Sequence, residues 1–354
     1  MRPPRSLTPV RVGVLTGGGD CPGLNAAIRA VVRKAEREFG DEVLGFRDGW
    51  TGVVEGRYEK LDIERMRGTL PRGGTVLGSS RSRPDLYERG LDQAREMLTE
   101  VGVDALIAIG GDGTLAAASR FHEMGGKVVG VPKTIDNDIP GTEMTFGFNT
   151  AVQIATDAID RLHTTAESHD RVMVVEVMGR HAGHVAVHSG IAGGATLILI
   201  PEHPFDIDDI CARLVRRHEH NRYASIVVVA EGAVPAAGTG LASPDAGTDM
   251  WGHRRLGGIG TLVAEAVQER TGFEARVTVL GHVQRGGTPT AFDRVLSTRF
   301  GIAAIDTVHD GAWGQMVALH SDEITRVPLA AVVGHERTLS DSLYHGVAGW
   351  FFAE

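Results

Sequence analysis

The sequence predicts an α/β protein built from two doubly wound, Rossmann-like α/β/α domains. Short apolar, β-rich segments alternate with helical segments, and several of the apolar segments end at clusters of glycine. Continuous apolar strands between helices are typical of parallel sheets that are covered on both faces. A length of 354 residues fits two domains, at roughly 100–200 residues each.

Each expected strand is a short apolar run that stops at a polar or glycine-rich segment. In chain order we expect strands at residues 10–15, 104–109, 127–131, 171–177, 195–200, 225–230 and 276–280. Helical patterns follow at residues 24–38, after 114, and at 149–166, 207–219 and 259–269. Residues 231–260, rich in Gly, Pro, Ala, Ser and Thr, indicate a long loop, either a flexible insertion or a lid. Ligands in such folds bind at the carboxyl ends of the strands.

Composition excludes several classes of protein. A net charge of −9 argues against non-specific binding of nucleic acid, although a local basic pocket can still take an anionic substrate. Two cysteines, Cys21 and Cys211, cannot form a disulfide framework, which favours a reducing compartment. Neither a membrane-spanning apolar run nor a signal-peptide core is present, so we expect a cytoplasmic protein without a membrane partner. The histidines and cysteines show no HExxH or Cys-x-x-Cys pattern, so no zinc site is expected.

Two glycine-rich segments, residues 16–25 and 110–114, each lie between an expected strand and a helix. Glycines let backbone N–H groups approach a phosphate, and a helix N-terminus adds positive potential. The first segment matches neither a Walker loop nor the dinucleotide pattern, so alone it indicates either a phosphate loop or a tight turn. In the second, Asp112 can hold Mg²⁺, and Thr114 can cap the helix and donate to a phosphate.

A third segment, residues 132–138, places two aspartates and an amide after another strand. One carboxylate can accept a hydroxyl proton while the other positions a metal or the backbone, although the same residues also favour an Asx turn. We interpret four arginines beside glycines at strand ends as an anion clamp, because their donors form a fork that suits phosphate. These are Arg171, Arg180, Arg276 and Arg285. Glu231 follows residues 226–230 and can accept hydrogen bonds from substrate hydroxyls.

Taken together, these segments closely resemble the 6-phosphofructokinase family of glycolysis. The resemblance runs from about Val10 to about Gly311 through GGDCPGLNAAIR, GGDGT, PKTIDNDIPGT, VVEVMGRHAG, AEG and VLGHVQRGGTP, in the family's order. It implies phosphoryl transfer to the 1-hydroxyl of fructose 6-phosphate with Mg²⁺, in a cleft between two domains. The larger domain, residues 1–147 and about 284–334, would bind the donor. The smaller, about 148–283 and 335–354, would bind the sugar phosphate.

The resemblance also implies individual roles. Asp136 matches the general base, Thr134 and Asp138 match its neighbours around substrate and metal, and Asp112 matches the Mg²⁺-associated aspartate. The residues matching the donor site are Gly18, Arg81, Ser82, Gly111, Gly113 and Thr114. The residues matching the sugar-phosphate site are Ile135, Met178, Gly179, Arg180, Glu231, His282 and Arg285. Arg171 and Arg276 match arginines that the family supplies from a neighbouring subunit, which implies a homo-oligomer, expected to be a tetramer.

Two positions bear on the phosphoryl donor. Pyrophosphate-dependent relatives carry an aspartate where this chain has Gly113, and that carboxylate would crowd and repel the α-phosphate of a nucleotide. Those relatives also carry a lysine at the place of Lys133, where the familiar bacterial ATP enzymes have glycine. The pairing resembles a mixed actinobacterial subgroup whose members generally use ATP. An aspartate would exclude a nucleotide by its bulk and charge, and Gly113 lacks that obstacle. We give this more weight than the one added cation at Lys133, and we predict ATP as the donor.

The resemblance is weaker at the family's effector site for ADP or phosphoenolpyruvate. Arg29 and Arg33 match its arginines, but Thr196 replaces an expected metal-linked glutamate and His163 an expected arginine. The usual lysine pair is replaced around residues 221–223. We therefore predict a weak or altered response to these effectors.

Three other functions compete with ATP-dependent phosphofructokinase. The first is a pyrophosphate-dependent phosphotransferase. The second is another kinase with GGDGT, such as an NAD kinase, against which GHVQRGG and MGRHAG argue. The third is a non-catalytic sugar-phosphate sensor, which would not need Asp112, Asp136 and Asp138.

Overall fold

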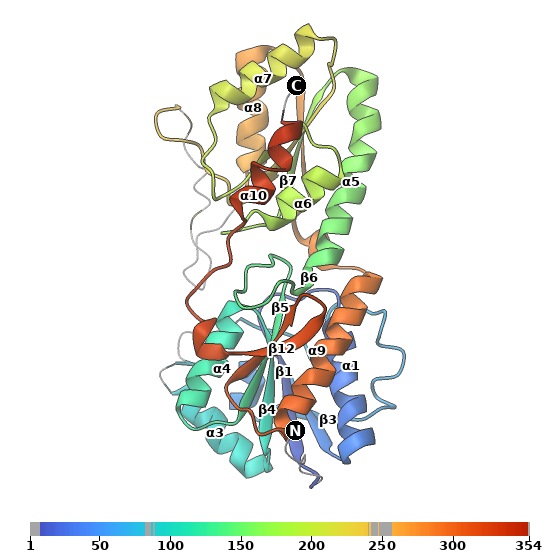
Figure 1. Ribbon diagram of the computed structural model, residues 1–354, viewed down its shortest axis with the longest axis vertical. Helices are drawn as coiled ribbons and strands as arrows, with labels where there is room; N and C mark the ends of the chain where they lie inside the picture. The colour runs from blue at the N-terminus through green and yellow to red at the C-terminus, as the bar shows by residue number, and fades with distance from the viewer. Residues whose placement is uncertain are drawn as a thin grey trace. The chain divides into compact units, whose positions relative to one another are not determined.

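The computed structural model describes residues 8–81, 86–87, 89–239, 241, 247 and 257–352, and the chain forms two compact units (Figure 1). The first unit comprises residues 1–135, 139–150 and 285–335, and the second comprises 136–138, 151–284 and 336–354. The short segment Asp136–Asp138 therefore groups with the second unit, whereas the sequence analysis placed it in the first. Its contacts with the C-terminal segment, described below, account for this difference.

The first unit contains an eight-stranded sheet of order β12-β11-β5-β4-β1-β2-β3, with β6 paired to β5. The strands are β1 (Arg11–Thr16), β2 (Glu42–Phe46), β3 (Tyr58–Leu61), β4 (Ala105–Gly110), β5 (Val128–Thr134), β6 (Phe146–Gly147), β11 (Gln315–His320) and β12 (Glu323–Pro328). The central strands β2, β1, β4, β5 and β11 run parallel. The loops that follow β1, β4 and β5 consequently share one edge of the sheet.

Helices cover both faces of this sheet (Figure 1). They are α1 (Leu24–Lys34), α2 (Trp50–Val54), α3 (Gly90–Val101), α4 (Asp112–Glu123) and α9 (Ala291–His309), with a π-helical turn at Ala35–Phe39 and a 3₁₀ turn at Leu329–Ala331. Buried side chains of α2, α3 and α4 form one apolar cluster with the sheet, which includes Trp50, Phe121 and Leu106. Helices α1 and α9 pack against each other on the opposite face.

Two strands of the first unit depart from the expected parallel pattern. β3 pairs with β2, and β12 with β11, in the antiparallel sense. Both β3 and β12 are edge strands with partly exposed side chains, so they lack the continuous apolar run by which the expected strands were predicted. Ser321, between β11 and β12, adopts a positive φ of 54°, which suits the tight turn of a hairpin.

The second unit contains a four-stranded parallel sheet of order β10-β7-β9-β8. Its strands are β7 (Val172–Val177), β8 (Leu197–Leu199), β9 (Ser225–Ala230) and β10 (Ala275–Val279). Its helices are all but the first three residues of α5 (Phe148–His169), α6 (His184–Ala192), α7 (Ile207–Glu219), α8 (Ile259–Thr271) and α10 (Asp341–Tyr344). It also contains a 3₁₀ turn at Ala348–Phe351 and most of the one at Gly281–Arg285. Side chains of α7 and α8 form an apolar cluster with the sheet on one face.

The fold class predicted from the sequence is confirmed. Each strand expected from an apolar run forms within three residues of its expected bounds, and the helices α7 and α8 begin where the helical pattern predicted. Of the expected loop, most residues between 240 and 256 lie outside the described part of the chain, as does Ser82. Within the described residues, no helix combines the length and apolarity needed to span a membrane.

Candidate functional site

In the first unit the two glycine-rich loops lie side by side, because β1 and β4 are parallel neighbours. The amide of Gly17 donates a hydrogen bond to the carbonyl of Ile109 at 2.9 Å. The buried side chain of Thr114 fills the space between the loops: a Cβ atom at Gly17 would lie 2.5 Å from Thr114 Oγ1, and one at Gly110 would lie 2.3 Å from Thr114 Cβ. A side chain at Gly17 would therefore push the first loop away from the second, and one at Gly110 would clash with Thr114 within the second loop.

The first loop turns sharply at Gly18, whose φ of 77° is in the region that favours glycine. Its amide donates to the carbonyl of Ser80 at 2.9 Å, and the hydroxyl of Ser79 donates to the carbonyl of Gly18 at 2.5 Å. These bonds fasten residues 79–80 onto the loop and place the exposed Arg81 directly after them. The neighbouring Ser82, also expected at the donor site, lies outside the described residues.

Two cationic side chains contact the backbone of the first loop. Lys133, at the end of β5, is only 2% exposed, and its ammonium donates to the carbonyl of Gly19. Arg285 Nη1 donates to the carbonyl of Asp20 at 3.3 Å. A Cβ atom at Gly19 would lie 2.5 Å from Arg285 Nη1, so the glycine makes this approach possible. The loop therefore combines glycine-permitted backbone approach with two positive charges, which is the chemistry of an anion site.

The second loop leads directly into α4. Gly111 is the N-cap residue of the helix, Asp112 and Gly113 are exposed in its first turn, and Thr114 is buried. The expectation that Thr114 caps the helix is wrong, because its side chain is enclosed between the two loops. Among the described residues, no atom lies within 4 Å of a Cβ atom placed at Gly113. A small side chain at this position would therefore meet no described neighbour.

Asp112 fits the expected association with Mg²⁺. Asp112 is exposed at the start of α4. The pKa of Tyr87 is raised, first by burial of the tyrosine and then by the negative charge of Asp112. Mg²⁺ is usually held by one or two carboxylates together with substrate phosphates and water, rather than by a cage of protein ligands. A single accessible carboxylate beside glycine loops meets that requirement.

In the second unit, loops after three parallel strands are bound to one another. After β7 and β9, the amide of Glu231 donates to the carbonyl of Val177 at 2.8 Å, and the amide of Gly232 donates to the carbonyl of Gly179 at 3.0 Å. After β10, the buried Gln284 accepts a hydrogen bond from the amide of Met178 at 3.3 Å. The loops carrying Met178, Gly179, Arg180, Glu231 and His282 therefore gather at the carboxyl edge of this sheet.

The turn Asp136–Asp138 is held by the C-terminal segment. Asn137 is buried and adopts a positive φ of 52°, a conformation that asparagine tolerates better than most residues. The amide of Arg337 donates to the carbonyl of Asp138 at 2.8 Å, and Arg337 Nη1 donates to the carbonyl of Asn137 at 3.4 Å. Asp136 is half-buried between these anchored residues and the buried Ile135. The backbone that directly follows the expected base is thus held by two hydrogen bonds.

Arg337 is itself positioned by His184, the first residue of α6. His184 Nε2 donates to the carbonyl of Arg337 at 3.2 Å. Burial, and then the positive charge of Arg337, lower the pKa of His184 to about 4, so the imidazole is neutral at pH 7. Sequence reasoning missed both Arg337 and Gln284, because neither contact follows a local pattern; Gln284 lies within GHVQRGG, which was the one available signal.

Two of the four arginines interpreted as an anion clamp lie away from Arg180 in their own subunit. Arg171 precedes β7, and Arg276 pairs with Met173 in the register of β10 and β7, so both lie at the amino edge of the sheet. Arg180 follows the carboxyl end of β7, and a strand of six residues is about 20 Å long. Arg171 Nε instead forms an ion pair with Glu274 Oε2 at 2.8 Å, and Arg276 pairs with the same carboxylate.

Cys21, in the first loop, has the properties of a structural residue. It is completely buried, and burial raises the pKa of its thiol to about 12. A Cβ atom at Gly147 would lie 2.5 Å from its sulfur, so the thiol fills the space left by that glycine. A nucleophilic role would require a thiolate, which this environment disfavours.

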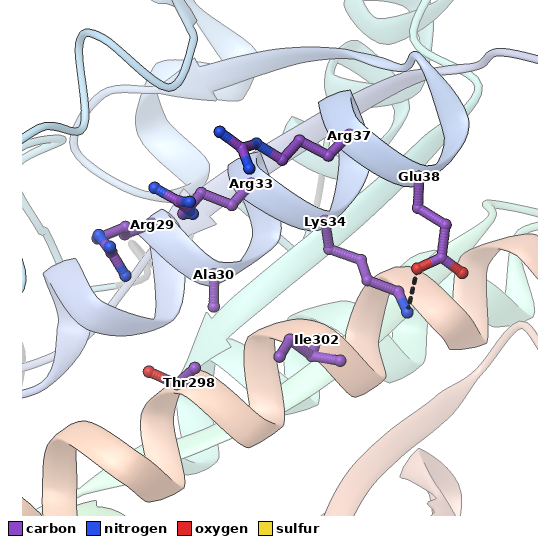
Figure 2. Close-up of a pocket in the computed structure, with 8 residues that line it drawn as sticks. All are labelled: Arg29, Ala30, Arg33, Lys34, Arg37, Glu38, Thr298 and Ile302. Atoms are coloured by element: carbon purple, nitrogen blue, oxygen red, sulfur yellow. Dashed lines mark ion pairs between the residues drawn. The ribbon is translucent and has the colours of Figure 1, made fainter.

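A separate cationic pocket of about 480 Å³ lies along α1 and α9 (Figure 2). Arg29, Arg33 and Arg37 line it from one side, and Thr298 and Ile302 line it from α9. Lys34 in this pocket forms an ion pair with Glu38 at 2.6 Å. The pocket includes both arginines that match the family's effector site, and the weak response to effectors stays a prediction.

Comparisons with known proteins find relatives over most of the chain. The family model described as Phosphofructokinase matches residues 11–308. A Streptomyces coelicolor protein named pyrophosphate–fructose 6-phosphate 1-phosphotransferase is 58% identical over 97% of this chain and 100% of its own length. ATP-dependent 6-phosphofructokinase 3 of the same organism is 54% identical over 95% of this chain and 98% of its own.

A solved structure extends the similarity to three dimensions. Pichia pastoris phosphofructokinase in the T-state superposes with a TM-score of 0.81 and 34% identity. The match covers 92% of this chain but 35% of the Pichia chain, so the present chain spans about a third of that larger protein. On the family match and on relatives aligned over their whole length, the chain belongs to the phosphofructokinase family.

Proposed function

We propose that this protein transfers the terminal phosphoryl group of ATP to the 1-hydroxyl of fructose 6-phosphate, giving fructose 1,6-bisphosphate and ADP. The observation that carries the proposal is the pair of glycine loops in the first unit, with Lys133 and Arg285 on the first loop and the start of α4 in the second. We assign donor binding to this unit. Sugar-phosphate binding is assigned to the second unit, where three strand-end loops present Arg180, Glu231 and His282.

The chemistry follows from these assignments. Asp136 accepts the proton of the 1-hydroxyl while that oxygen bonds to the γ-phosphorus and the bond to the bridging oxygen of ADP breaks. Backbone N–H groups of the glycine loops and the N-terminus of α4 stabilise the phosphate charge. Mg²⁺, held at Asp112, would neutralise further charge on the phosphates. The bonds from Arg337 to the backbone of Asn137 and Asp138 hold the base in place.

The role of Asp136 is tested by substitution. Asp136→Ser should lower kcat by roughly 10²–10⁴-fold, the usual contribution of a general base, while the KM for fructose 6-phosphate changes little. Asp136→Asn, which keeps the shape but cannot take up the proton, should behave alike. Asp322→Ser, at a fully exposed carboxylate, is the matched control and should retain turnover. Steady-state assays decide: unchanged turnover in the Asp136 variants contradicts the assignment.

Gly113 supports ATP as the donor. It is exposed in the first turn of α4, where the donor phosphates would be bound, and a Cβ atom there meets no described atom within 4 Å. Gly113→Asp should therefore fold and should weaken the use of ATP at least tenfold, because a carboxylate repels the nucleotide phosphates. Gly113→Ala adds bulk without charge and should retain most of the activity. Equal kcat/KM for ATP in wild type and the Asp variant would contradict the proposal.

A second candidate donor, pyrophosphate, is favoured by one observation. The buried ammonium of Lys133 lies on the first glycine loop, where it would attract a small, highly charged anion. Relatives of similar identity are named for either donor. Parallel assays with fructose 6-phosphate and Mg²⁺ separate the two donors. Turnover with ATP alone supports the proposal. Turnover with pyrophosphate alone overturns it and makes Lys133, not Gly113, the residue that decides the donor.

We further propose that the working enzyme is a homo-oligomer, expected to be a tetramer. Arg171 and Arg276 lie at the opposite edge of their sheet from Arg180, Glu231 and His282. Arginines at that edge can serve the sugar-phosphate site of a neighbouring copy. The edge strand β10 also exposes the apolar side chains of Val277 and Val279, which another subunit would cover.

A further inference from the structure

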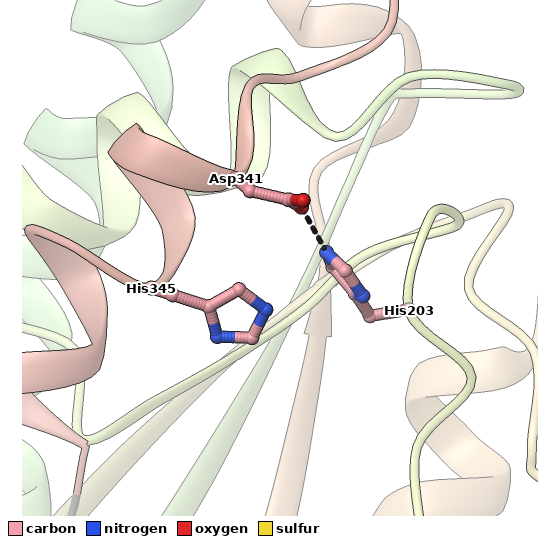
Figure 3. A group of neighbouring side chains, drawn as sticks. All are labelled: His203, Asp341 and His345. Carbon is pink, nitrogen blue, oxygen red and sulfur yellow. Dashed lines mark ion pairs between the residues drawn. The ribbon is translucent and has the colours of Figure 1, made fainter.

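We propose that His203, Asp341 and His345 form a binding site for a divalent transition-metal ion, with Zn²⁺ as the best fit (Figure 3). The three residues belong to the second unit, and their ligand atoms all lie within 4.8 Å of one another. No other group of three such residues was found in the described part of the chain. The site is separate from the residues assigned above to phosphoryl transfer.

The donor set selects the class of metal. Two imidazoles and one carboxylate, with a fourth position left for water, make up the usual ligands of an open zinc site. Mg²⁺ and Ca²⁺ prefer oxygen ligands throughout, so the Mg²⁺ of the phosphoryl-transfer reaction should not compete here. Ligand atoms about 2.0–2.1 Å from a tetrahedral ion lie roughly 3.3 Å from each other. His203 Nε2 and Asp341 Oδ1 are separated by 3.3 Å.

Two of the three ligands come from a single turn of helix. Asp341 is the first residue of α10 and His345 is its C-cap residue, so their spacing of four places both on one face. Figure 3 shows the side chains of Asp341 and His345 both directed toward His203. His345 is exposed, so rotating its ring to bring a nitrogen closer to the other two ligands meets little resistance.

The third ligand is already oriented. The ring of His203 stacks on Tyr344, with 4.9 Å between ring centroids and an interplanar angle of 12°. The hydroxyl of Tyr344 donates to the carbonyl of Ile198 at 2.8 Å, which fixes the tyrosine against the sheet. One imidazole is therefore already held in place for an ion. On metal binding, only the exposed side chains of Asp341 and His345 would lose conformational freedom.

Metal binding would fasten the C-terminal segment to the sheet. Glu202, beside His203, accepts hydrogen bonds from the amides of Leu339 and Gly183, each at 3.0 Å. An ion at the proposed site adds a second link between the same two segments. Because it binds the folded chain and not the unfolded one, it should raise the midpoint of thermal unfolding.

Cobalt titration of the full chain, free of any purification tag and of bound metal, tests the proposal. In excess Mg²⁺, we expect one Co²⁺ per chain, with visible d–d bands, no sulfur-to-metal charge transfer, and displacement by Zn²⁺. Imidazole ligands must be unprotonated, so binding should weaken as the pH is lowered. Absence of these bands, or sulfur charge transfer, overturns the proposal.

Substitutions locate the ion. Asp341→Ala, at a side chain that is 81% exposed, and His345→Ala should each weaken Co²⁺ binding at least tenfold and abolish the metal-dependent rise in Tm. His320→Gln, at an exposed histidine of β11, is the matched control and should bind Co²⁺ like wild type. Far-UV circular dichroism verifies folding of each variant. Unchanged Co²⁺ affinity in both site variants would refute the proposed ligands.

Discussion

His184 links protonation of one buried residue to the stability of the second unit. Its pKa is lowered to about 4, chiefly by burial, from an ordinary value of 6.5. Between these pH values the unfolded chain takes up a proton at this position that the folded chain does not bind. The free energy of unfolding therefore decreases as the pH falls from 6.5 to 4. His188, whose pKa burial also lowers, acts in the same direction.

This linkage predicts the effect of a single substitution. Between pH 7.5 and pH 5, protonation at His184 should cost about 2 kcal/mol of unfolding free energy. His184→Gln should lose less stability over that interval than wild type, even if its stability at pH 7.5 is lower. Urea unfolding at both pH values measures the two differences, with the exposed His320→Gln as control. Equal losses in His184→Gln and wild type would show that this histidine does not control the acid response.

At the scale of elements, helices α1 and α9 pack closely because α9 carries a glycine at the contact. A Cβ atom at Gly301 would lie 2.5 Å from the carbonyl oxygen of Ala27 and 2.8 Å from Ala30 Cβ. Both neighbours belong to α1: the first is a backbone atom, and the second is a methyl carbon attached directly to the backbone. Neither atom can move away unless the whole helix moves. The close approach of these two helices therefore depends on the missing side chain.

Gly301→Ala should accordingly destabilise the protein by about 1–3 kcal/mol, the usual cost of overpacking. Helix propensity alone would predict the opposite, a gain of up to about 1 kcal/mol. Gly113→Ala, in α4, is the matched control, because no described atom lies within 4 Å of the added methyl group. Denaturant unfolding of both variants distinguishes the two effects: a gain in stability for Gly301→Ala would mean that α1 and α9 can separate at little cost.

At the scale of the whole molecule, the positions of Arg171 and Arg276 require a neighbouring copy if they are to bind substrate. Arg276→Ala should raise the KM for fructose 6-phosphate by roughly 10–100-fold, the value of a hydrogen bond to a charged group. If the arginine is supplied in trans, mixed oligomers of Arg276→Ala and Asp136→Ser subunits should contain some intact sites.

Dissociating and reassociating the two variants together should therefore restore part of the activity that each lacks alone. Reassociated Asp136→Ser and Asp136→Asn subunits are the control, since every site in that mixture lacks the base. Activity of the first mixture no greater than the sum of its parts would rule out shared sites.

Local patterns in the sequence were sufficient to predict the fold class, most of the buried strands and the two glycine-rich loops. Strand β9 was predicted to the residue, and the other expected strands to within three residues, because they are apolar runs that end at polar or glycine-rich segments. The two glycine-rich loops were predictable for a related reason: each is a contiguous segment after a strand, and parallel strands bring such segments to one edge. The strands missed, β2, β3, β6, β11 and β12, include the two edge strands of the first sheet, whose half-exposed side chains carry no strong pattern.

The tertiary structure decided the contacts between residues that are distant in the chain. It bound Arg337 to the turn at Asn137, it separated Arg171 and Arg276 from Arg180, and it brought His203 beside Asp341 and His345. No zinc site was expected from the sequence, because His203 is far along the chain from Asp341 and His345 and no HExxH or Cys-x-x-Cys pattern is present. Spacing along the chain reports the local backbone geometry of a helix, strand or turn, whereas contacts between distant segments depend on how these elements pack.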